Sequence, residues 1–239
     1  MATVANRFCD QNGGKATRRV PHEDGNSLKD WECRAFSPGT ESGPKDGDRR
    51  DAYEREIGME HPGEPEPHGP HRRVAASILS FDVFPGRQVT PVLLRKPVEA
   101  GDTVGCRYHL AWGIDIFFAA RVISRFDGLA GGTWRTGFTY RTLDGHPLLG
   151  EETFAVEKDV ATGRVRVSIR SWSRPEILLA RAFYPVARCL QVRGGRGMLE
   201  HLGSMALEKN DECPRTNDER MTKAQMPKDE GSRGGFRSP

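Results

Sequence analysis

The sequence lacks long apolar runs. No stretch approaches the roughly 20 apolar residues that a helix needs to span a bilayer. Residues 1–15 also lack the apolar core of about seven or more residues that marks a secretory signal. We therefore predict a cytoplasmic protein without a membrane span.

The sequence also lacks a large excess of positive or negative charge. The 36 Lys and Arg residues are interspersed with 33 Asp and Glu residues, and the net charge is +3. A protein that reads nucleic acid is expected to carry a one-signed stripe with aromatic residues between the charges, and no segment here does. The charge pattern therefore predicts solubility and no nucleic-acid partner.

Cysteine pairs and the common catalytic motifs do not occur. The five cysteines are an odd set with no CxxC pair and no spacing suited to tetrahedral zinc, so we predict reduced thiols and no metal site. There is no GxGxxG before a helix, no P-loop, no GxSxG and no HExxH. These absences argue against most nucleotide-binding, esterase and metalloprotease functions, and we predict no cofactor.

Apolar residues are scarce at both ends of the chain. The N-terminal part is rich in Gly, Pro and charge, and such a stretch buries too little apolar surface to offset its chain entropy. We predict a disordered tail at residues 1–71, one domain at residues 72–205 and a second disordered tail at residues 206–239. A native start at Met59 is a further hypothesis, which leaves open whether residues 1–58 belong to the protein.

The middle of the chain alternates apolar and polar residues with period two, the pattern of half-buried strands. In one segment Val165, Val167 and Ile169 alternate with polar residues, and another, residues 114–126, is apolar on both parities, as expected for a strand covered on both faces. Turn signals such as Asp144-Gly145 separate the segments. The pattern predicts an antiparallel meander of five strands. These are residues 102–112, 114–126, 134–143, 151–158 and 164–170.

Helical spacing appears on both sides of the meander. Val74, Ile78 and Phe81 favour a front helix, although Leu79, Phe81 and Val83 would also fit a strand. After the meander, Ser173 is expected to be the N-cap and Pro175 to lie in the first turn of a long helix that is kinked at Pro185. The apolar stripe of this helix is predicted at Leu179, Phe183, Val186 and Leu190.

A sheet with one apolar face and a helix with one apolar stripe must cover each other. The predicted fold class is therefore α+β, with a curved antiparallel meander wrapped on a long C-terminal helix. This arrangement resembles the helix-grip fold of the START and Bet v 1 type, which leaves a cavity between sheet and helix. A hot-dog fold would place its long helix before the sheet, and a lipocalin-like barrel would need about eight strands.

Three motifs carry a resemblance to a known family. They are GFTYRTLDGHP and GEETF, both within residues 137–159, and the SRP that begins at Ser173. In this order they resemble the uncharacterised bacterial and plant family called domain of unknown function nineteen-ninety, over residues 74–203. The resemblance implies no particular activity. The chain ahead of Val74 departs from the family pattern, as does the glycine-rich stretch 193–197, which is expected to break or loosen the helix.

Polar residues on the apolar face of the meander are the candidate site residues. Tyr140, Thr142 and Glu152 share the parity of apolar neighbours on their strands. Because an unpaired buried carboxylate is unfavourable, Glu152 is expected either to form a structural ion pair with Arg121 or to act as a ligand anchor or a pKa-shifted acid. A tyrosine such as Tyr140 is more often a core residue whose hydroxyl is hydrogen-bonded. The predicted ligand-binding residues are Tyr140, Thr142, Glu152 and Arg121.

The segment 143–147 is first of all a turn, in which Asp144-Gly145 supplies positive-φ positions and Pro147 holds His146 extended. A functional interpretation is that the hairpin tip presents His146 at the mouth of the cavity. There it would act as a general acid or base, because its ordinary pKa lies near neutrality.

Three classes of function remain open. The leading hypothesis is a binding module that holds a small apolar ligand between sheet and helix, by analogy of fold. The second is a hydrolase- or cyclase-like enzyme with His146 and Glu152 as candidate catalytic residues, which requires both side chains to converge on a concave site. The third is an interaction scaffold, which would show a filled core and a large exposed apolar patch. The oligomeric state is also left open.

Overall fold

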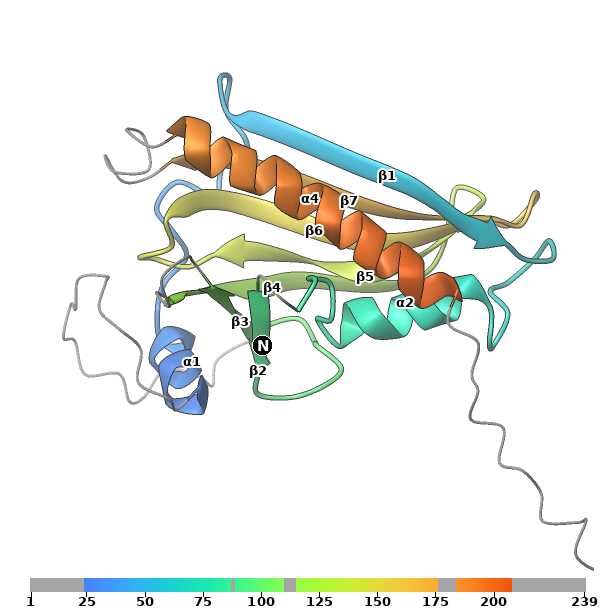
Figure 1. Cartoon of the computed structure of the whole chain (residues 1–239), viewed down its shortest axis with the longest axis horizontal. Helices are drawn as coiled ribbons and strands as arrows, with labels where there is room; N and C mark the ends of the chain where they lie inside the picture. Colours follow the sequence, from blue (N-terminus) through green and yellow to red (C-terminus); the bar gives the residue numbers. More distant parts are fainter. Residues whose placement is uncertain (1–23, 87–88, 110–114, 176–183, 208–239) are drawn as a thin grey trace, which may run out of the picture. The chain divides into compact units, whose positions relative to one another are not determined.

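A seven-stranded antiparallel sheet forms the centre of the described chain (Figure 1). A computed structural model describes residues 24–86, 89–109, 115–175 and 184–207. The strands are β1 Arg49–Met59, β2 Val89–Leu93, β3 Thr103–His109, β4 Asp115–Ala130, β5 Thr133–Thr142, β6 Leu148–Asp159 and β7 Arg164–Pro175. Their order is β1-β7-β6-β5-β4-β3-β2, so β2 to β7 form a meander and β1 joins the β7 edge.

The five predicted strands are confirmed as β3 to β7, and the fold class is the predicted α+β helix-grip arrangement. On β7, Val165, Val167 and Ile169 are fully buried in the main core, so the face read from the alternation is right for this strand. Strand β2 was not predicted from the sequence. This strand is short and carries Pro91, which an edge strand tolerates because one side of it makes no ladder hydrogen bonds.

Helices cover both faces of the sheet. In the described chain they are α1 Asp24–Glu32, α2 Pro70–Leu79 and α4 Tyr184–Leu207. The long helix α4 lies along one face and contacts β1, β7 and α2 (Figure 1). On the same face α2 contacts β5 and β6, which confirms the predicted front helix. Between these helices and the sheet lies the main core, whose largest fully buried side chains include Phe81, Phe138, Phe154 and Leu202.

The segment before α2 belongs to the fold. Strand β1 pairs along its length with β7, and α1 packs on β2 and β3. The prediction that residues 1–71 form a disordered tail is therefore wrong for residues 24–71. A chain that began at Met59 would lack both of these elements. Residues 1–23 and 208–239, for which disorder was also predicted, lie outside the described residues.

Strand β1 has few apolar residues because it is an edge strand. Only its alternate side chains face the core, where Tyr53 packs and Ile57 is buried. Its outward-facing Glu54 instead pairs with Arg170 of β7. The composition of such a strand resembles that of a tail, which explains why the sequence analysis missed it.

A second, smaller apolar cluster lies where α1 meets the opposite face of the sheet. Leu28 and Trp31 of α1 pack there with Val92, Ala119 and Leu143. Strand β4 is therefore covered on both faces, as its apolar residues on both parities predicted. The prediction that all cysteines are reduced is wrong, because Cys33 is disulfide-bonded. By contrast, Cys106 is a buried free thiol.

The C-terminal helix begins later than predicted. Ser173 and the residues up to Pro175 belong to β7, because the pairing of β7 with β6 continues to the pair of Pro175 with Leu148. Helix α4 begins at Tyr184 and ends at Leu207, just beyond the predicted end of the domain. The proposed N-cap role of Ser173 is therefore wrong.

The predicted apolar stripe of this helix cannot be compared residue by residue. Leu179 and Phe183 lie outside the described residues, and the side chains of Val186 and Leu190 are not described. Further along α4, a stripe of buried residues packs on the main core. It consists of Met198, Leu202 and Ala206.

The glycine-rich stretch 193–197 does not break α4, contrary to the prediction. The helix runs through it without interruption. A Cβ atom at Gly195 would lie 2.6 Å from a ring carbon of Tyr53, and one at Gly197 would lie 3.4 Å from the ring of Pro85. The glycines thus let α4 approach β1 and the loop before β2 closely, and this packing offsets their weak helix propensity.

We expect Gly195→Ala to destabilise the protein by about 1–3 kcal/mol, because the new methyl group would overlap the Tyr53 ring. In Gly194→Ala a Cβ atom meets nothing within 4 Å, so better helix propensity should stabilise the protein by about 0.5–1 kcal/mol. Urea unfolding of the two variants measures both effects. Equal changes of the same sign would show that α4 does not lie against Tyr53.

Candidate ligand-binding cavity

A cavity of about 360 Å³ lies between the sheet and α4. Aromatic residues from β1, β3, β4, β5, β7 and the loop before β2 form much of its wall, and α4 contributes Gly194, Gly195 and Met198. The Phe, Tyr and Trp residues that line it are Tyr53, Phe84, Tyr108, Phe118, Tyr140 and Trp172. A cavity is therefore present beneath the C-terminal helix, as predicted from the sequence.

One row of directly opposed residues brings polar groups into this cavity. The register pairs Asp51 of β1 with Ser171 of β7, Ser171 with Glu152 of β6, and Glu152 with Tyr140 of β5. Directly opposed residues of antiparallel strands point to the same face, and all four line the cavity. The next row on this face is apolar. It consists of Tyr53, Ile169, Phe154 and Phe138.

The carboxyl group of Glu152 accepts a hydrogen bond from the hydroxyl of Tyr140 at 2.5 Å. Burial raises the pKa of Glu152 to about 7, although the hydrogen bond from Tyr140 lowers it; the nearby charge of Asp51 raises it. Burial also raises the pKa of Tyr140 well above its usual value, so the phenol keeps its proton. At neutral pH, Glu152 can therefore either give or take a proton, unlike an exposed glutamate.

His146 and Thr142 lie in the wall of the same cavity. His146 is buried, its Nδ1 is 2.7 Å from the carbonyl oxygen of Leu148, and its ring packs edge-on against Phe118. Burial lowers the pKa of His146 to about 4, so the imidazole is neutral at neutral pH. The hydroxyl of Thr142 accepts the N–H of Gly150 at 3.1 Å. Both side chains thus face the cavity while bound to backbone groups.

Arg121 is not part of the cavity, and the predicted ion pair between Arg121 and Glu152 is wrong. The guanidinium of Arg121 donates to the carbonyl oxygen of Glu32 at 2.6 Å and lies over the ring of Phe36. Both partners belong to the α1 side of the sheet. Arg121 points to the same face of β4 as Phe117, as predicted. Strand β4 is covered on both faces, however, and this face is the one on which Phe117 contacts Trp31 of α1.

Asp51 and Ser171 were not predicted as site residues. Asp51 was assigned to the disordered tail, and its strand offers too few apolar residues to be recognised. Ser171 could have been found, because it continues the parity of Val165, Val167 and Ile169. The predicted end of that strand at residue 170 excluded it.

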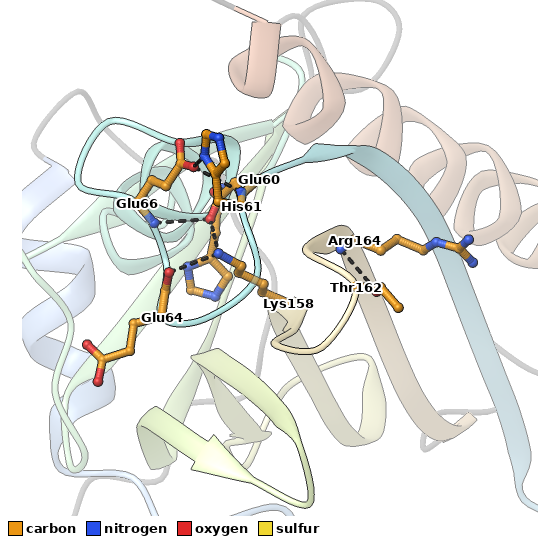
Figure 2. Close-up of polar contacts among 8 residues, drawn as sticks. Glu60, His61, Glu64, Glu66, Lys158, Thr162 and Arg164 are labelled. Atoms are coloured by element: carbon orange, nitrogen blue, oxygen red, sulfur yellow. Dashed lines mark hydrogen bonds and ion pairs between the residues drawn. The ribbon is translucent and has the colours of Figure 1, made fainter.

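A second buried polar cluster lies where β1 leads into α2 (Figure 2). The carboxylate of Glu60 and the ammonium of Lys158 are 2.9 Å apart, and both side chains are fully buried. Lys158 also donates to the carbonyl oxygen of Glu64, and Glu60 accepts the backbone N–H groups of Glu66 and His71. Because both charges are paired and hydrogen-bonded, this cluster joins the segment before α2 to β6 and has a structural role.

His71 follows this cluster, at the start of α2. Its side chain is fully buried, and neither ring nitrogen has a hydrogen-bond partner among the described residues. Burial lowers the pKa of His71 to about 4, although the charge of Glu60 raises it. The ring is therefore neutral at neutral pH, and its protonation in the unfolded chain destabilises the fold as the pH falls below about 6.5.

The described residues contain neither a helix that could span a membrane nor a cluster of metal ligands. None of their helices is both long and apolar enough to cross a membrane. No group of three or more His, Cys, Asp or Glu residues among them could hold a metal ion.

Comparison with known families supports the resemblance seen in the sequence. A family model described as Domain of unknown function (DUF1990) matches residues 35–201, more than half of the chain. This match confirms the predicted family. It also moves the start of the family region from residue 74 to residue 35, so the segment that contains β1 is not a departure from the family.

Two relatives carry the name UPF0548 protein. One, from Deinococcus radiodurans, is 35% identical over 85 residues, which cover 36% of this chain and 40% of the relative. The other, from Dictyostelium discoideum, is 30% identical over 144 residues, which cover 56% of this chain and 66% of the relative. The chain thus matches less than two thirds of the length of either relative.

Solved structures with a partial likeness include the hypothetical protein jhp0584 from Helicobacter pylori. It is 13% identical, with a TM-score of 0.48 over 72% of this chain and 96% of the other. Major latex-like protein 151 from Panax ginseng is 8% identical, with a TM-score of 0.41 over 67% of this chain and 99% of the other. These likenesses concern the fold alone.

We expect Glu152→Gln to stabilise the protein more at pH 8 than at pH 5. The raised pKa means that folding opposes ionisation of Glu152, so its unfavourable contribution grows as the pH rises from about 4.5 to 7 and is complete above 7. With a discount for partial exposure, the gain from Glu152→Gln should be about 2 kcal/mol larger at pH 8 than at pH 5.

Chemical unfolding of both proteins at the two pH values measures this difference. His71 and His146 are present in both proteins, so their own pH effects cancel. A gain that is the same at both pH values would contradict the raised pKa of Glu152.

Lys158→Met should lower the free energy of unfolding by about 3–5 kcal/mol, because it leaves the charge of Glu60 buried without its partner. The matched control is Arg170→Met, which removes a 52% exposed cation from its pair with Glu54 and should cost less than about 1 kcal/mol. Thermal and urea unfolding provide the comparison. Similar losses in the two variants would mean that Lys158 is solvated and not buried.

Proposed function

The chain belongs to the family described as Domain of unknown function (DUF1990), a description that assigns no activity, and from this premise we propose that the protein binds a small apolar molecule in the cavity beneath α4. The ligand would lie between the sheet and the helix. Tyr140, Thr142 and Glu152 would serve as its polar anchors, without the Arg121 that the sequence suggested.

The observation that carries the proposal is the size and lining of the cavity. Protein interiors are close-packed and contain few voids larger than a water molecule, because a void forfeits contacts and reduces stability. A volume of about 360 Å³ is far above that limit, and it lies within the range of about 300–1,000 Å³ typical of small-molecule sites. Walls that are mostly apolar with a few convergent polar groups are also typical of such sites.

The polar groups are arranged so that they can orient a ligand without filling the space. Tyr140 and Glu152 are bound to each other, and Thr142 is bound to the backbone of Gly150, so these groups are held in place before a ligand arrives. Groups that are already ordered lose little entropy on binding. An apolar ligand with one polar end would therefore be held in one direction.

A hydrolase- or cyclase-like enzyme remains the second candidate. It is favoured by the pKa of Glu152, which is raised to about 7 by burial and suits an acid–base group. His146 lines the same cavity, but its pKa of about 4 and its contact with Leu148 suit a wall residue better than a base. The interaction scaffold is less well supported. Exposed large apolar residues such as Met59, Leu129 and Leu207 lie on three separate elements.

A series of straight-chain alcohols tests the binding function, measured by isothermal titration calorimetry below the concentrations at which they aggregate. We expect the affinity to rise about fourfold for each added methylene group, since a buried CH₂ contributes about 0.8 kcal/mol. The rise should stop at the length that fills the cavity. The absence of binding for every alcohol would refute the proposal.

Ser171→Phe provides the matched variant, because its ring would occupy the cavity between Asp51 and Glu152. We expect it to weaken binding of the best alcohol more than tenfold. Thr139→Phe is the control, since Thr139 pairs with Thr153 on the opposite face of the sheet. Thermal melting of both variants checks that they fold. Unchanged binding in folded Ser171→Phe would place the alcohol elsewhere.

A further inference from the structure

We propose that the protein carries a second site, which cleaves small acyl esters at the β2 edge of the sheet. Thr90 of β2 is its nucleophile and His109 of β3 its general base, and Asp115 of β4 holds this base in position. The site lies on the face of the sheet opposite the cavity. It is therefore independent of the proposed ligand-binding function.

Two hydrogen bonds join these three side chains in a row. The hydroxyl oxygen of Thr90 lies 2.8 Å from Nε2 of His109. On the other side of the ring, Nδ1 of His109 lies 2.9 Å from a carboxylate oxygen of Asp115. A hydroxyl group within hydrogen-bond reach of a base, with a third group that orients the base, is the arrangement by which proteins activate a nucleophile.

The carboxylate of Asp115 fixes the direction of both hydrogen bonds. A carboxylate can only accept, so Nδ1 of His109 donates to it. In the neutral imidazole the other nitrogen, Nε2, then carries no hydrogen and accepts. The hydroxyl of Thr90 therefore donates its proton to Nε2, which is the direction that activation of a nucleophile requires.

The register of three adjacent strands brings these residues together. His109 and Asp115 are directly opposed, and Thr90 is opposed to Arg107, two residues before His109 on the same face. Thr90 and His109 are therefore diagonal neighbours, a spacing that a long or aromatic side chain can bridge. Because strands hold side chains more precisely than loops do, the geometry is present before a substrate arrives. Arg107 has a further interaction, and we assign it no role in the reaction.

The alternation of side chains separates this site from the cavity. The residues next to the three along their strands are Val89, Tyr108 and Ile116, and all of these line the cavity. Successive side chains of a strand point to opposite faces. The three side chains of the site thus lie on the other face of the sheet, on which Phe117 contacts α1.

The site is open to a substrate from solvent. The side chains of His109 and Asp115 are 36% and 38% exposed, and Thr90 is partly exposed. Exposed polar contacts of this kind contribute little to stability, and the fold does not need them to satisfy buried groups. A surface site offers few contacts for binding, so small esters with a good leaving group are the substrate class that fits it.

The reaction has two steps and needs only water besides the ester. As the oxygen of Thr90 bonds to the acyl carbon, its proton moves to Nε2 of His109 and then to the leaving oxygen, whose bond to the acyl carbon breaks. In the second step water attacks the acyl group and gives a proton to His109. This proton returns to Thr90 as its bond to the acyl carbon breaks. Asp115 keeps its hydrogen bond to Nδ1 and stabilises the imidazolium in both steps.

The test is hydrolysis of p-nitrophenyl acetate by the full chain, followed through the release of p-nitrophenolate. We expect a rate at least about tenfold above that of an equal concentration of free imidazole, since general-base catalysis by a positioned group contributes about 100-fold or more. Mass spectrometry of peptides from the protein, quenched in acid during the reaction, should find an acetyl group on Thr90.

Three variants assign the roles. Thr90→Val keeps the shape of the side chain, and it and His109→Gln should each lower kcat at least about tenfold. Asp115→Asn should lower kcat to a similar extent with KM nearly unchanged, because Asp115 positions the base and does not touch the ester. Asp115→Glu keeps the carboxylate and should restore part of kcat. A purely structural role of Asp115 would not produce this split or this recovery.

His61→Gln is the matched control. In the described chain, His61 also contacts a carboxylate, that of Glu66, but no hydroxyl group (Figure 2). Its side chain is 94% exposed, so it reports the hydrolysis that any accessible imidazole gives. This variant should leave kcat unchanged.

Several results would overturn the proposal. They are a rate no higher than that of imidazole, an unchanged kcat in Thr90→Val, or an acetyl group on a residue other than Thr90. Thermal melting checks that each variant folds, and acetyl capture on the unchanged protein decides the assignment even where a variant does not. Ligand binding in the cavity is measured separately, so failure of this site leaves the binding function standing.

Discussion

The cross-strand register of β1, β7, β6 and β5 is the constraint on which the rest of the structure depends. Side chains alternate strictly between the two faces of a strand, so a shift by one residue would turn every inward group outward. In the observed register, one row contributes apolar side chains to the main core and the next brings Asp51, Ser171, Glu152 and Tyr140 under α4. The helix covers both rows. It lies close to the sheet at Gly195, and the cavity lies beside this contact.

Two glutamate side chains illustrate how the surroundings of a carboxyl group decide its role. The carboxylate of Glu60 is paired with Lys158 and accepts two backbone N–H groups. Its charge is therefore compensated, and its role is structural. Among the described residues, the carboxyl group of Glu152 contacts the phenol of Tyr140 and is repelled by the charge of Asp51, and burial raises its pKa to about 7. A charge that the fold satisfies holds the structure together. A carboxyl group in the wall of a cavity, with a raised pKa and no cationic partner among the described residues, is a candidate for contact with a ligand.

How far the sequence could predict this arrangement depends on how apolar each element is. Strands β3 to β7 alternate clearly enough to be found, and the motifs between residues 137 and 175 identified the family. Strand β1 was not predicted because its inward positions include Asp51 and Arg55. These charged residues interrupt the alternation of apolar and polar residues that marks a strand. Arg121 was assigned to the wrong face because β4 is apolar on both parities, and only the position of α1 decides which parity faces the cavity. Helix α4 continues through its glycines because Gly195 packs against Tyr53 of β1. Helix propensity depends on neighbouring residues in the sequence and cannot predict this contact.

The most direct test of the central claim is to locate a bound ligand. Nuclear Overhauser effects can be measured between a saturating straight-chain alcohol and the isotope-labelled protein. We expect contacts of the alkyl chain with the methyl group of Met198 and the rings of Phe118 and Tyr140. Contacts confined to exposed side chains such as Leu129, or none with the residues beneath α4, would contradict it.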